Sequence, residues 1–281
     1  MYFFKYSSIG NDFILINNIE EKIPEKEFPD MAKILCERRF GIGADGILVL
    51  ENSQKADFKM RIFNSDGSEA EMCGNGIRAI AKHVYQSKLI TNTELRVETL
   101  AGIKILKLFL KNNVVESIEV DMGIPKLFRN EIPMIGENTK VIGEELNVDG
   151  NVYKITCVSM GNPHCVIYED NINSVDIKIG NKIETHPIFP NKTNIEFVQI
   201  INDKELKLKV WERGAGETLA CGTGACASVV SSVLNKFIKK NQLTIVHLPG
   251  GDLKIKWAND NHVYMTGPSE KIFEGEIDWK G

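Results

Sequence analysis

Two cysteines in this sequence stand in nearly identical surroundings. Cys73 begins the run Cys-Gly-Asn-Gly, and Cys221 begins the run Cys-Gly-Thr-Gly. An apolar pattern with helical spacing follows each run, which places each sulfur at the N-terminus of a predicted helix. The positive end of a helix lowers the pKa of a nearby thiol. We therefore expect both cysteines to be reactive acid–base groups.

Two such groups could move one proton across a carbon atom. If they approach the same carbon from opposite sides, one sulfur removes a proton as thiolate while the other delivers one as thiol. Backbone N–H groups at the same helix ends could hold a substrate carboxylate and stabilise the charge that develops on it. A lone cysteine before a helix is more often a small buried residue, but the symmetric pair favours catalysis. The remaining cysteines have apolar settings and are interpreted as structural: Cys36, Cys157, Cys165 and Cys226.

Both cysteines belong to an internal repeat. They are 148 residues apart (221 − 73), and the same offset relates matching residues on both sides of the motif, from residue 63 to residue 102. The matching pairs are Phe63 and Trp211, Asn64 and Glu212, Glu69 and Glu217, Ala79 and Ala227, Leu95 and Leu243, and Gly102 and Gly250. A constant spacing over such a length indicates an ancient duplication.

The predicted elements follow the same order in both halves. Runs rich in β-branched and aromatic residues, bounded by turn residues, predict strands. In the first half these are residues 2–6, 13–17, 47–50, 58–63, 95–99, 103–110 and 114–121. In the second half they are residues 152–159, 165–168, 195–201, 206–211, 243–247, 253–257 and 263–266, with a last strand over 271–278.

Helices are predicted at four places. The spacing of apolar residues predicts one over 30–39, with Asp30 near its N-cap, and one over 175–184. The other two follow Cys73 and Cys221, and the second is expected to reach Phe237. Strands and helices in this mixture predict an α+β fold.

The chain is expected to form two pseudo-symmetric domains. Gly123 and Pro125 punctuate the sequence after the last strand of the first half, where a boundary is favoured. The predicted division is residues 1–121, rejoined by the C-terminal segment 268–281, and residues 122–267.

Composition and charge argue against several classes of protein. The formal net charge is −4, which argues against a nucleic-acid partner. A start without a secretory signal, and no apolar run long enough for a membrane helix, predict a cytoplasmic protein without a membrane partner. In that reducing compartment the six cysteines are expected as thiols, and the absence of a CxxC pair argues against structural zinc.

Three glycine motifs match a dinucleotide-binding pattern only superficially. Residues 41–46 satisfy G-x-G-x-x-G, and residues 74–79 and 222–227 satisfy its alanine variant. The fingerprint must follow directly on a buried parallel strand, and none of the three does. We interpret these glycines as allowing tight turns, and as letting backbone N–H groups converge on an anion.

The sequence closely resembles the diaminopimelate epimerases of bacterial and plant lysine biosynthesis, and the resemblance spans nearly the whole chain. It is carried by residues 10–13, 41–46, 63–69, 73–76, 160–164, 194–197, 211–218 and 220–224. The resemblance implies interconversion of LL- and meso-2,6-diaminopimelate, which serves lysine and peptidoglycan precursor synthesis, without metal, pyridoxal phosphate or nucleotide. It also implies two domains, each a curved, mostly antiparallel sheet around a central helix, with the site in the cleft between them.

The resemblance further implies a role for particular residues. Cys73 and Cys221 would be the acid–base pair. Backbone donors would hold the reacting carboxylate: Gly74, Asn75, Gly222 and Thr223. Side chains would hold the distal amino-acid end: Asn11, Asn64, Asn162, Asn194, Glu212 and Arg213. His164 and Glu212 are expected near the thiols, where they could bias their protonation.

Two positions depart from the family pattern. Some members have Gln where this chain has Gly46, so one substrate contact is in doubt. Some members carry Tyr at a dimer interface where this chain has Phe273, which keeps the apolar area and loses the hydroxyl. A homodimer is still expected.

Three alternatives stay open from the sequence. A proline or hydroxyproline racemase, or a phenazine-type isomerase, could share the fold. A non-catalytic amino-acid binding protein would tolerate loss of both thiols. In a redox-regulated protein, Cys73 and Cys221 would form a switchable disulfide.

Overall fold

The computed structural model describes residues 1–279. Its contacts divide the chain into two compact units, and each is described by itself. The first contains Met1–Val120 and the described part of Thr266–Gly281, and the second contains Asp121–Met265. The last two residues of the expected returning segment 268–281 lie outside the described residues. In the described part of the chain, no helix combines the length and apolar character needed to cross a membrane.

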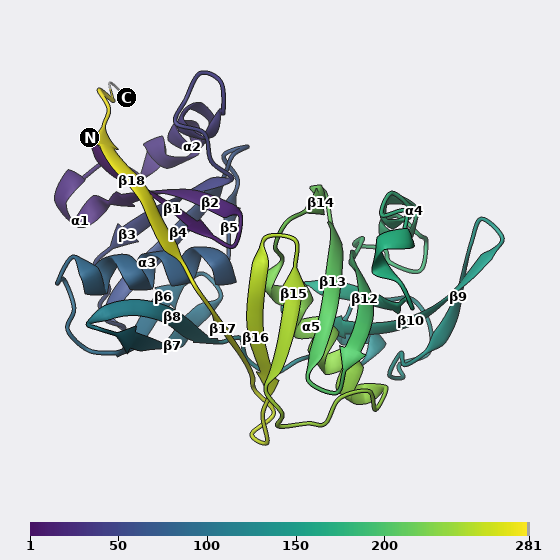
Figure 1. The fold of residues 1–281 in the computed structure, drawn as a ribbon. Coiled ribbons are helices and arrows are strands. Elements are labelled where there is room, and N and C mark those ends of the chain that lie inside the picture. The colour runs from purple at the N-terminus through teal and green to yellow at the C-terminus, as the bar shows by residue number, and fades with distance from the viewer. Residues whose placement is uncertain (280–281) are drawn as a thin grey trace. The chain divides into compact units, whose positions relative to one another are not determined.

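The first unit is built on one sheet (Figure 1). Its strands are β1 (Tyr2–Ser8), β2 (Asn11–Asn17), β3 (Gly46–Glu51), β4 (Phe58–Asn64), β5 (Glu69–Ala70), β6 (Glu94–Thr99), β7 (Gly102–Lys111), β8 (Val114–Asp121) and β18 (Glu270–Glu276). Its helices are α1 (Asn18–Glu21), α2 (Phe28–Cys36) and α3 (Gly74–Gln86), with a 3-10 turn η1 (Glu25–Glu27).

Pairing in this sheet is mostly antiparallel. The order β18-β1-β2-β3-β4-β6-β7-β8 contains two parallel pairs, β2 with β3 and β4 with β6. The C-terminal strand β18, yellow in Figure 1, lies beside β1 at the start of the chain. Helix α3 packs against β1 to β4 and β7, so the sheet curves around it.

The second unit has strands β9 (Glu144–Val148), β10 (Asn151–Ser159), β11 (Pro163–Tyr168), β12 (Asn194–Asn202), β13 (Glu205–Glu212), β14 (Gly216–Thr218), β15 (Thr244–Leu248), β16 (Gly251–Trp257) and β17 (Val263–Gly267). Its helices are α4 (Ile179–Glu184) and α5 (Gly222–Leu234), with 3-10 turns η2 (Arg129–Glu131) and η3 (Ile172–Ser174). Helix α5 packs against β10 to β13 and β16.

The two units repeat one topology. In the second unit the order β9-β10-β11-β12-β13-β15-β16 again has two parallel pairs, β11 with β12 and β13 with β15. Each central helix follows a short strand, β5 or β14, that turns back on the strand before it. The repeat read from the sequence therefore corresponds to two copies of one sheet-and-helix unit, and the α+β class is confirmed.

Each sheet also has a second, apolar layer on the face away from its central helix. In the first unit, α2 contributes Phe28, Met31 and Leu35 to a buried cluster with Ile14 and Ile47 of the sheet. In the second unit a comparable cluster gathers apolar residues of β9 to β12 and α4. Because both faces are covered, central strands such as β3 and β11 are buried over nearly their whole length.

Three predicted helix limits were wrong. Helix α2 begins at Phe28, with Pro29 in its first turn, and ends at Cys36; Asp30 lies in the first turn and is not the N-cap. Helix α4 covers only Ile179–Glu184, because the residues before it form turns. Helix α5 ends at Leu234, and Phe237 lies beyond it with 45% of its surface exposed.

Candidate active site

Both cysteines are the N-caps of their helices. The Sγ of Cys73 accepts a hydrogen bond from the N–H of Gly76 at 3.4 Å, at the start of α3. The Sγ of Cys221 accepts one from the N–H of Gly224 at 3.3 Å, at the start of α5. Each cysteine has an extended backbone, so its side chain turns back over the first helical turn. The duplicated sequence thus produces the same sulfur-to-helix contact in both units.

The second glycine of each motif is required by close packing. A Cβ on Gly76 would lie 2.8 Å from Cδ2 of Leu48, and a Cβ on Gly224 would lie 2.8 Å from Oε1 of Glu196 and 3.2 Å from the Sγ of Cys221. Neither glycine has the left-handed conformation that only glycine adopts readily. For these two glycines the interpretation that they permit tight turns was therefore wrong, because Gly76 provides space for Leu48 and Gly224 provides space beside Glu196 and the sulfur. Gly43 of the first motif does have a left-handed conformation, with φ at +80°.

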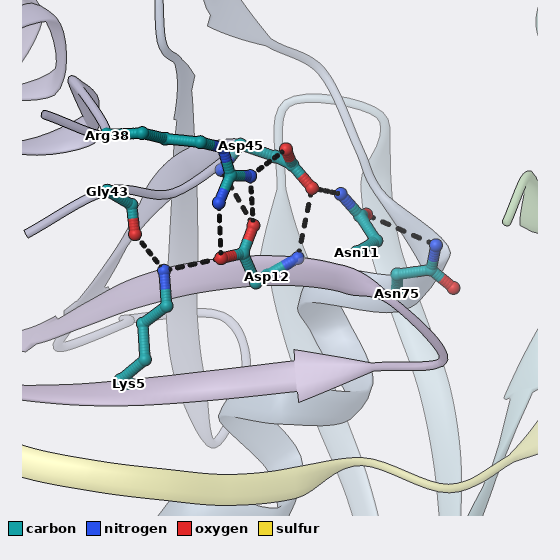
Figure 2. Close-up of polar contacts among 7 residues, drawn as sticks. All are labelled: Lys5, Asn11, Asp12, Arg38, Gly43, Asp45 and Asn75. Carbon is teal, nitrogen blue, oxygen red and sulfur yellow. Dashed lines mark hydrogen bonds and ion pairs between the residues drawn. The ribbon is translucent and has the colours of Figure 1, made fainter. Parts of the chain in front are cut away.

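Around Cys73 two amide side chains are connected. The Oδ1 of Asn11 lies 3.8 Å from the Sγ of Cys73 and accepts a hydrogen bond from Nδ2 of Asn75 at 3.2 Å. The Nδ2 of Asn11 donates to Asp45 at 2.6 Å, as Figure 2 shows. Arg78, fully buried on α3, donates to the carbonyl oxygen of Gly74 at 3.0 Å. The first turn of α3 is thereby fixed to β2.

Beside this amide pair lies a network of charges from three segments. Lys5 of β1 contacts Asp12 of β2 at 2.7 Å and the carbonyl oxygen of Gly43, and Arg38 contacts both Asp12 and Asp45 (Figure 2). Burial raises the pKa of Asp12, but hydrogen bonds from Arg38 and Lys5 outweigh it and lower the pKa to about 2. The network keeps the loop after α2 against the start of β2.

The first glycine motif, residues 41–46, is not an anion cradle. Its backbone N–H groups are used by the C-terminal turn of α2: Gly41 donates to the carbonyl of Glu37, and Ile42 and Gly43 donate to that of Leu35. A Cβ on Gly41 would lie within 2.4 to 2.8 Å of three carbonyl oxygens. The expectation that its N–H groups converge on an anion was therefore wrong for this motif.

Two further expected contacts lie in the first unit. Asn64, exposed at the end of β4, donates through Nδ2 to the hydroxyl of Ser68 at 3.0 Å. Gly46 begins β3, and a Cβ there would lie 2.6 Å from the carbonyl oxygen of Phe63. In this chain the close approach of β3 to β4 therefore leaves no room for a side chain at position 46 unless the backbone shifts.

The surroundings of Cys221 are more enclosed. Its residue surface is 5% exposed, and its Sγ lies 3.5 Å from the hydroxyl of Thr223. Burial raises the pKa of the Cys221 thiol well above its ordinary value, and the carboxylates of Glu212 and Glu196 raise it further. Hydrogen bonds from Thr223 and Gly224 lower it but do not compensate. The expectation that the helix end would lower the pKa was therefore wrong for Cys221.

A continuous chain of polar contacts leads from Cys221 into the core. The Oγ1 of Thr223 accepts from Nδ2 of Asn162 at 3.3 Å, and the Oδ1 of Asn162 lies 3.0 Å from Nε2 of His164. The Nδ1 of His164 lies 2.7 Å from Oε1 of Glu196. Three residues expected at the site, Thr223, Asn162 and His164, are thus brought together beside the sulfur.

Sequence reasoning assigned no role to Glu196. The residue lies on β12 between Ile195 and Phe197, is fully buried, and its Oε2 has no hydrogen-bond partner among the described residues. Burial raises the pKa of Glu196, and His164 lowers it. A charged residue inside an otherwise apolar strand was the signal in the sequence, because a buried carboxylate is rarely tolerated without a partner.

Glu212 lies beside the same sulfur. It is half-buried at the end of β13 and accepts a hydrogen bond from the hydroxyl of Thr218. Burial raises the pKa of Glu212, and hydrogen bonds from Thr218 and Cys221 lower it. Glu212 therefore lies near the thiol, as expected, and its negative charge disfavours the thiolate of Cys221.

The Arg213 turn is held by Asn194. The backbone N–H of Arg213 donates to Oδ1 of Asn194 at 2.9 Å, and Nδ2 of Asn194 donates to the carbonyl of Pro163 at 2.8 Å. The guanidinium of Arg213 is exposed and donates to the carbonyl of Asn191, and within residues 1–279 it forms no ion pair. Asn194 is therefore mainly an anchor, while Arg213 presents its charge to solvent.

Phe273 lies on the strand β18. Its surface is 46% exposed, and its ring meets that of Phe3 edge-on with centroids 6.0 Å apart. Across residues 1–279 no group of three or more His, Cys, Asp or Glu residues is arranged to hold a metal ion. What each unit does present is a sulfur at a helix end, backbone donors beside it, and amide or guanidinium side chains nearby.

Comparison with known proteins gives one consistent result. The family described as "Diaminopimelate epimerase" matches residues 3–128 and 156–272. A diaminopimelate epimerase of Pelotomaculum thermopropionicum is 51% identical over 281 residues, which cover all of both chains. One from Moorella thermoacetica is 50% identical over 279 residues and 99% of each chain, and one from Methanococcus maripaludis is 49% identical over 280 residues.

Solved structures with much lower sequence identity share the fold. A probable proline racemase of Agrobacterium radiobacter, with bound carbonate, has a TM-score of 0.73 at 11% identity, covering 99% of this chain and 92% of that one. A phenazine biosynthesis protein of Bacillus anthracis has a TM-score of 0.72 at 17% identity, covering 99% of both. The fold expected from the sequence is thereby confirmed. With relatives at about half identity over their full length, the chain belongs to the diaminopimelate epimerase family, whose members are isomerases.

Proposed function

We propose that this chain interconverts LL- and meso-2,6-diaminopimelate through two thiols, Cys73 and Cys221, and needs no cofactor. One observation supports this above the others. Both sulfurs cap helices of the same length and position in the repeat, with nearly equal contacts to a backbone N–H of the first turn. Family membership supports the substrate, and the duplicated placement of the thiols supports the two-base chemistry.

The proposed reaction moves one proton and leaves every other bond intact. A thiolate removes the α-proton and becomes a thiol, and the electron pair of the broken C–H bond spreads into the carboxylate. The opposite thiol then delivers its proton to the other face of the carbon and becomes a thiolate. Burial and the carboxylates of Glu212 and Glu196 raise the pKa of the Cys221 thiol, which favours the protonated form that the acid of the pair needs.

The groups around each sulfur stabilise the intermediate. Backbone N–H groups of Gly74, Asn75, Gly222 and Thr223 point out of the first helical turns, where negative charge is favoured. A preorganised donor at such a position contributes on the order of 3 kcal/mol to the transition state. Two helix ends acting on one carboxylate supply a large part of what an organic cofactor would otherwise supply.

Recognition of the distal end of the substrate is proposed for a second set of side chains. Arg213 is exposed, carries no carboxylate partner within the described residues and is suited to bidentate binding of a carboxylate. Glu212 is suited to an ammonium group. The amide side chains proposed beside them are Asn11, Asn64, Asn162 and Asn194.

The proposal includes three further expectations from the sequence. The domains are residues 1–121 with 268–281 and residues 122–267, which the repeated strand order supports. The protein acts in the cytoplasm on a small molecule, without nucleic-acid or membrane partners. It forms a homodimer in which Phe273, half-exposed on β18, contributes apolar area.

The test is a chirality-resolved assay on LL-diaminopimelate with no cofactor added. Cys73→Ala and Cys221→Ala are each expected to lower kcat by at least about 10²-fold, because each removes one partner of the proton transfer. Cys226→Ala, on the same helix as Cys221, is the matched control and should stay near the parent rate. Parent-like turnover by either catalytic variant would exclude the two-thiol mechanism.

Deuterated water gives a second readout of the same proposal. Because the delivered proton comes from a thiol that exchanges with solvent, the newly formed stereoisomer should carry deuterium at one α-carbon. Unlabelled product would mean that the proton is transferred without an exchangeable acid.

A further inference from the structure

The side-chain amide of Asn11 is held at both ends. Its Nδ2 donates to Oδ2 of Asp45 at 2.6 Å, and its Oδ1 accepts from Nδ2 of Asn75 at 3.2 Å (Figure 2). The contact to Asp45 is the stronger anchor, because it is shorter and its acceptor is a carboxylate.

The direction of this amide chain is fixed by the groups at its two ends. Arg78 can only donate, and its guanidinium donates to Oδ1 of Asn75 at 2.9 Å. Asn75 must therefore turn its Nδ2 toward Asn11. At the other end the ionised carboxylate of Asp45 can only accept, so Asn11 must turn its Nδ2 toward Asp45. If either amide were reversed, two donors or two acceptors would face each other, and a hydrogen bond would be lost.

Asp45 is itself immobilised by donors on both oxygens. Its Oδ1 accepts from Arg38 at 2.8 Å, and its Oδ2 accepts from the backbone N–H of Asp12 at 3.0 Å as well as from Asn11. Arg38 also holds the carboxylate of Asp12, which Lys5 contacts from the neighbouring strand. The end of the first glycine motif thus places a fixed, acceptor-only group next to Asn11.

The consequence reaches Cys73. With Nδ2 committed to Asp45, the Oδ1 of Asn11 faces the sulfur at 3.8 Å, where the thiol S–H can donate to it. An amide oxygen favours the protonated sulfur, whereas an amide N–H₂ in its place would favour the thiolate. The charged groups joined to this amide within the unit are Asp45, Asp12, Arg38 and Lys5 on one side and, through Asn75, Arg78 on the other.

We propose that Asp45 is a positioning residue, which keeps the carbonyl oxygen of Asn11 turned toward the Cys73 sulfur. The importance of Asp45 for catalysis rests on the proposed function. The effect of Asp45 on the Cys73 sulfur does not rest on it. Asp45 restrains Cys73 until substrate binds, because the oxygen it orients holds the thiol proton. The glycine motif that resembles a dinucleotide fingerprint therefore serves to place this carboxylate.

The test measures how fast iodoacetamide alkylates Cys73 in the full-length chain at neutral pH, with the Cys73 peptide quantified by mass spectrometry. Asp45→Ala is expected to speed alkylation by about 3- to 10-fold, the equivalent of one lost hydrogen bond to the thiol. Asp45→Asn should act in the same direction. Both oxygens of Asp45 accept hydrogen bonds, so the N–H₂ group that replaces one of them would face a donor.

A double-mutant cycle separates orientation from simple loss of charge. If Asp45 acts through the amide, Asp45→Ala should have no further effect in an Asn11→Ala background. An equal effect in both backgrounds, or one that disappears at high salt, would identify a charge effect and overturn the proposal. So would an unchanged rate in both single variants of Asp45.

Asp57→Ala is the matched control, since this exposed carboxylate also accepts one backbone N–H, from Arg96 at 2.6 Å. It should leave the alkylation rate at the parent value while costing similar stability. The outcome is independent of the proposed function. Full epimerase activity of Cys73→Ala would refute that function, yet the alkylation rates would still decide the role of Asp45.

Discussion

The imidazole of His164 and the carboxylate of Glu196 are joined by a hydrogen bond of 2.7 Å, and neither side chain is exposed to solvent. On its other side the Nε2 of His164 faces Oδ1 of Asn162, which can only accept, so Nε2 carries a proton. The pair thus fixes the Asn162 amide behind Cys221.

Glu196→Gln is expected to lower the pKa of Cys221. The carboxylates of Glu196 and Glu212 both disfavour the thiolate, and the Gln variant removes the first of them. The pH dependence of Cys221 alkylation, read by mass spectrometry, should shift to lower pH. Asp252→Asn is the matched control, because Asp252 also pairs with a histidine, His247, at 2.8 Å but on the surface. An unshifted profile in Glu196→Gln would show that this carboxyl does not act on the thiol.

Gly224→Ala is expected to lower the free energy of unfolding by about 1–3 kcal/mol, as for other overpacked cores. The new Cβ would lie 2.8 Å from Glu196 and 3.2 Å from the Cys221 sulfur, and both atoms are buried and held. Its repeat partner Gly76 provides the comparison, since there the near atom is the flexible end of Leu48. Urea unfolding should show a smaller loss for Gly76→Ala. Equal losses would mean that the carboxyl can move aside.

Much of the fold could be predicted because the two halves repeat the same pattern of strands. The helix limits could not, since they depend on tertiary contacts. Helix α2 ends at Cys36 because the glycine-rich loop folds back on its last carbonyls, and Asp30 resembles an N-cap although Pro29 precedes it inside the helix. The motif-bearing residues of the site were identifiable from type and spacing. Glu212 was expected near the thiols, but the influence of Glu196 on Cys221 was not, because Glu196 reaches the sulfur from a strand of its own, β12.

Arg213→Lys is expected to raise KM for diaminopimelate by about 10- to 100-fold with a smaller change in kcat. The loss corresponds to roughly 1.5–3 kcal/mol for a hydrogen bond to a charged group, and Lys cannot reproduce the planar, bidentate geometry. Steady-state kinetics in both directions would measure it. Arg39→Lys, another exposed arginine, should leave KM unchanged. A change confined to kcat would place Arg213 at the reacting end of the substrate.

His83 is expected to make stability depend on pH below neutrality. The residue is buried on α3, and its Nδ1 lies 3.3 Å from the hydroxyl of Tyr6. Burial lowers the pKa of His83 to about 4, with a smaller contribution from Lys271. Because this folded-state pKa lies below the ordinary value near 6.5, the stabilisation is complete above about pH 6.5 and is lost as the pH falls toward 4.

The measurement is urea unfolding at a series of pH values. Between about pH 6 and pH 4 the imidazole of His83 is protonated in the unfolded chain but not in the folded chain. The free energy of unfolding should therefore change with a slope of up to about 1.4 kcal/mol per pH unit. His83→Gln keeps a polar, neutral side chain next to Tyr6 and should remove this contribution to the slope. His247→Gln, at a histidine that is partly exposed and paired with Asp252, should not. If His83→Gln retained the full parent slope, the acid sensitivity would have to come from groups other than this imidazole.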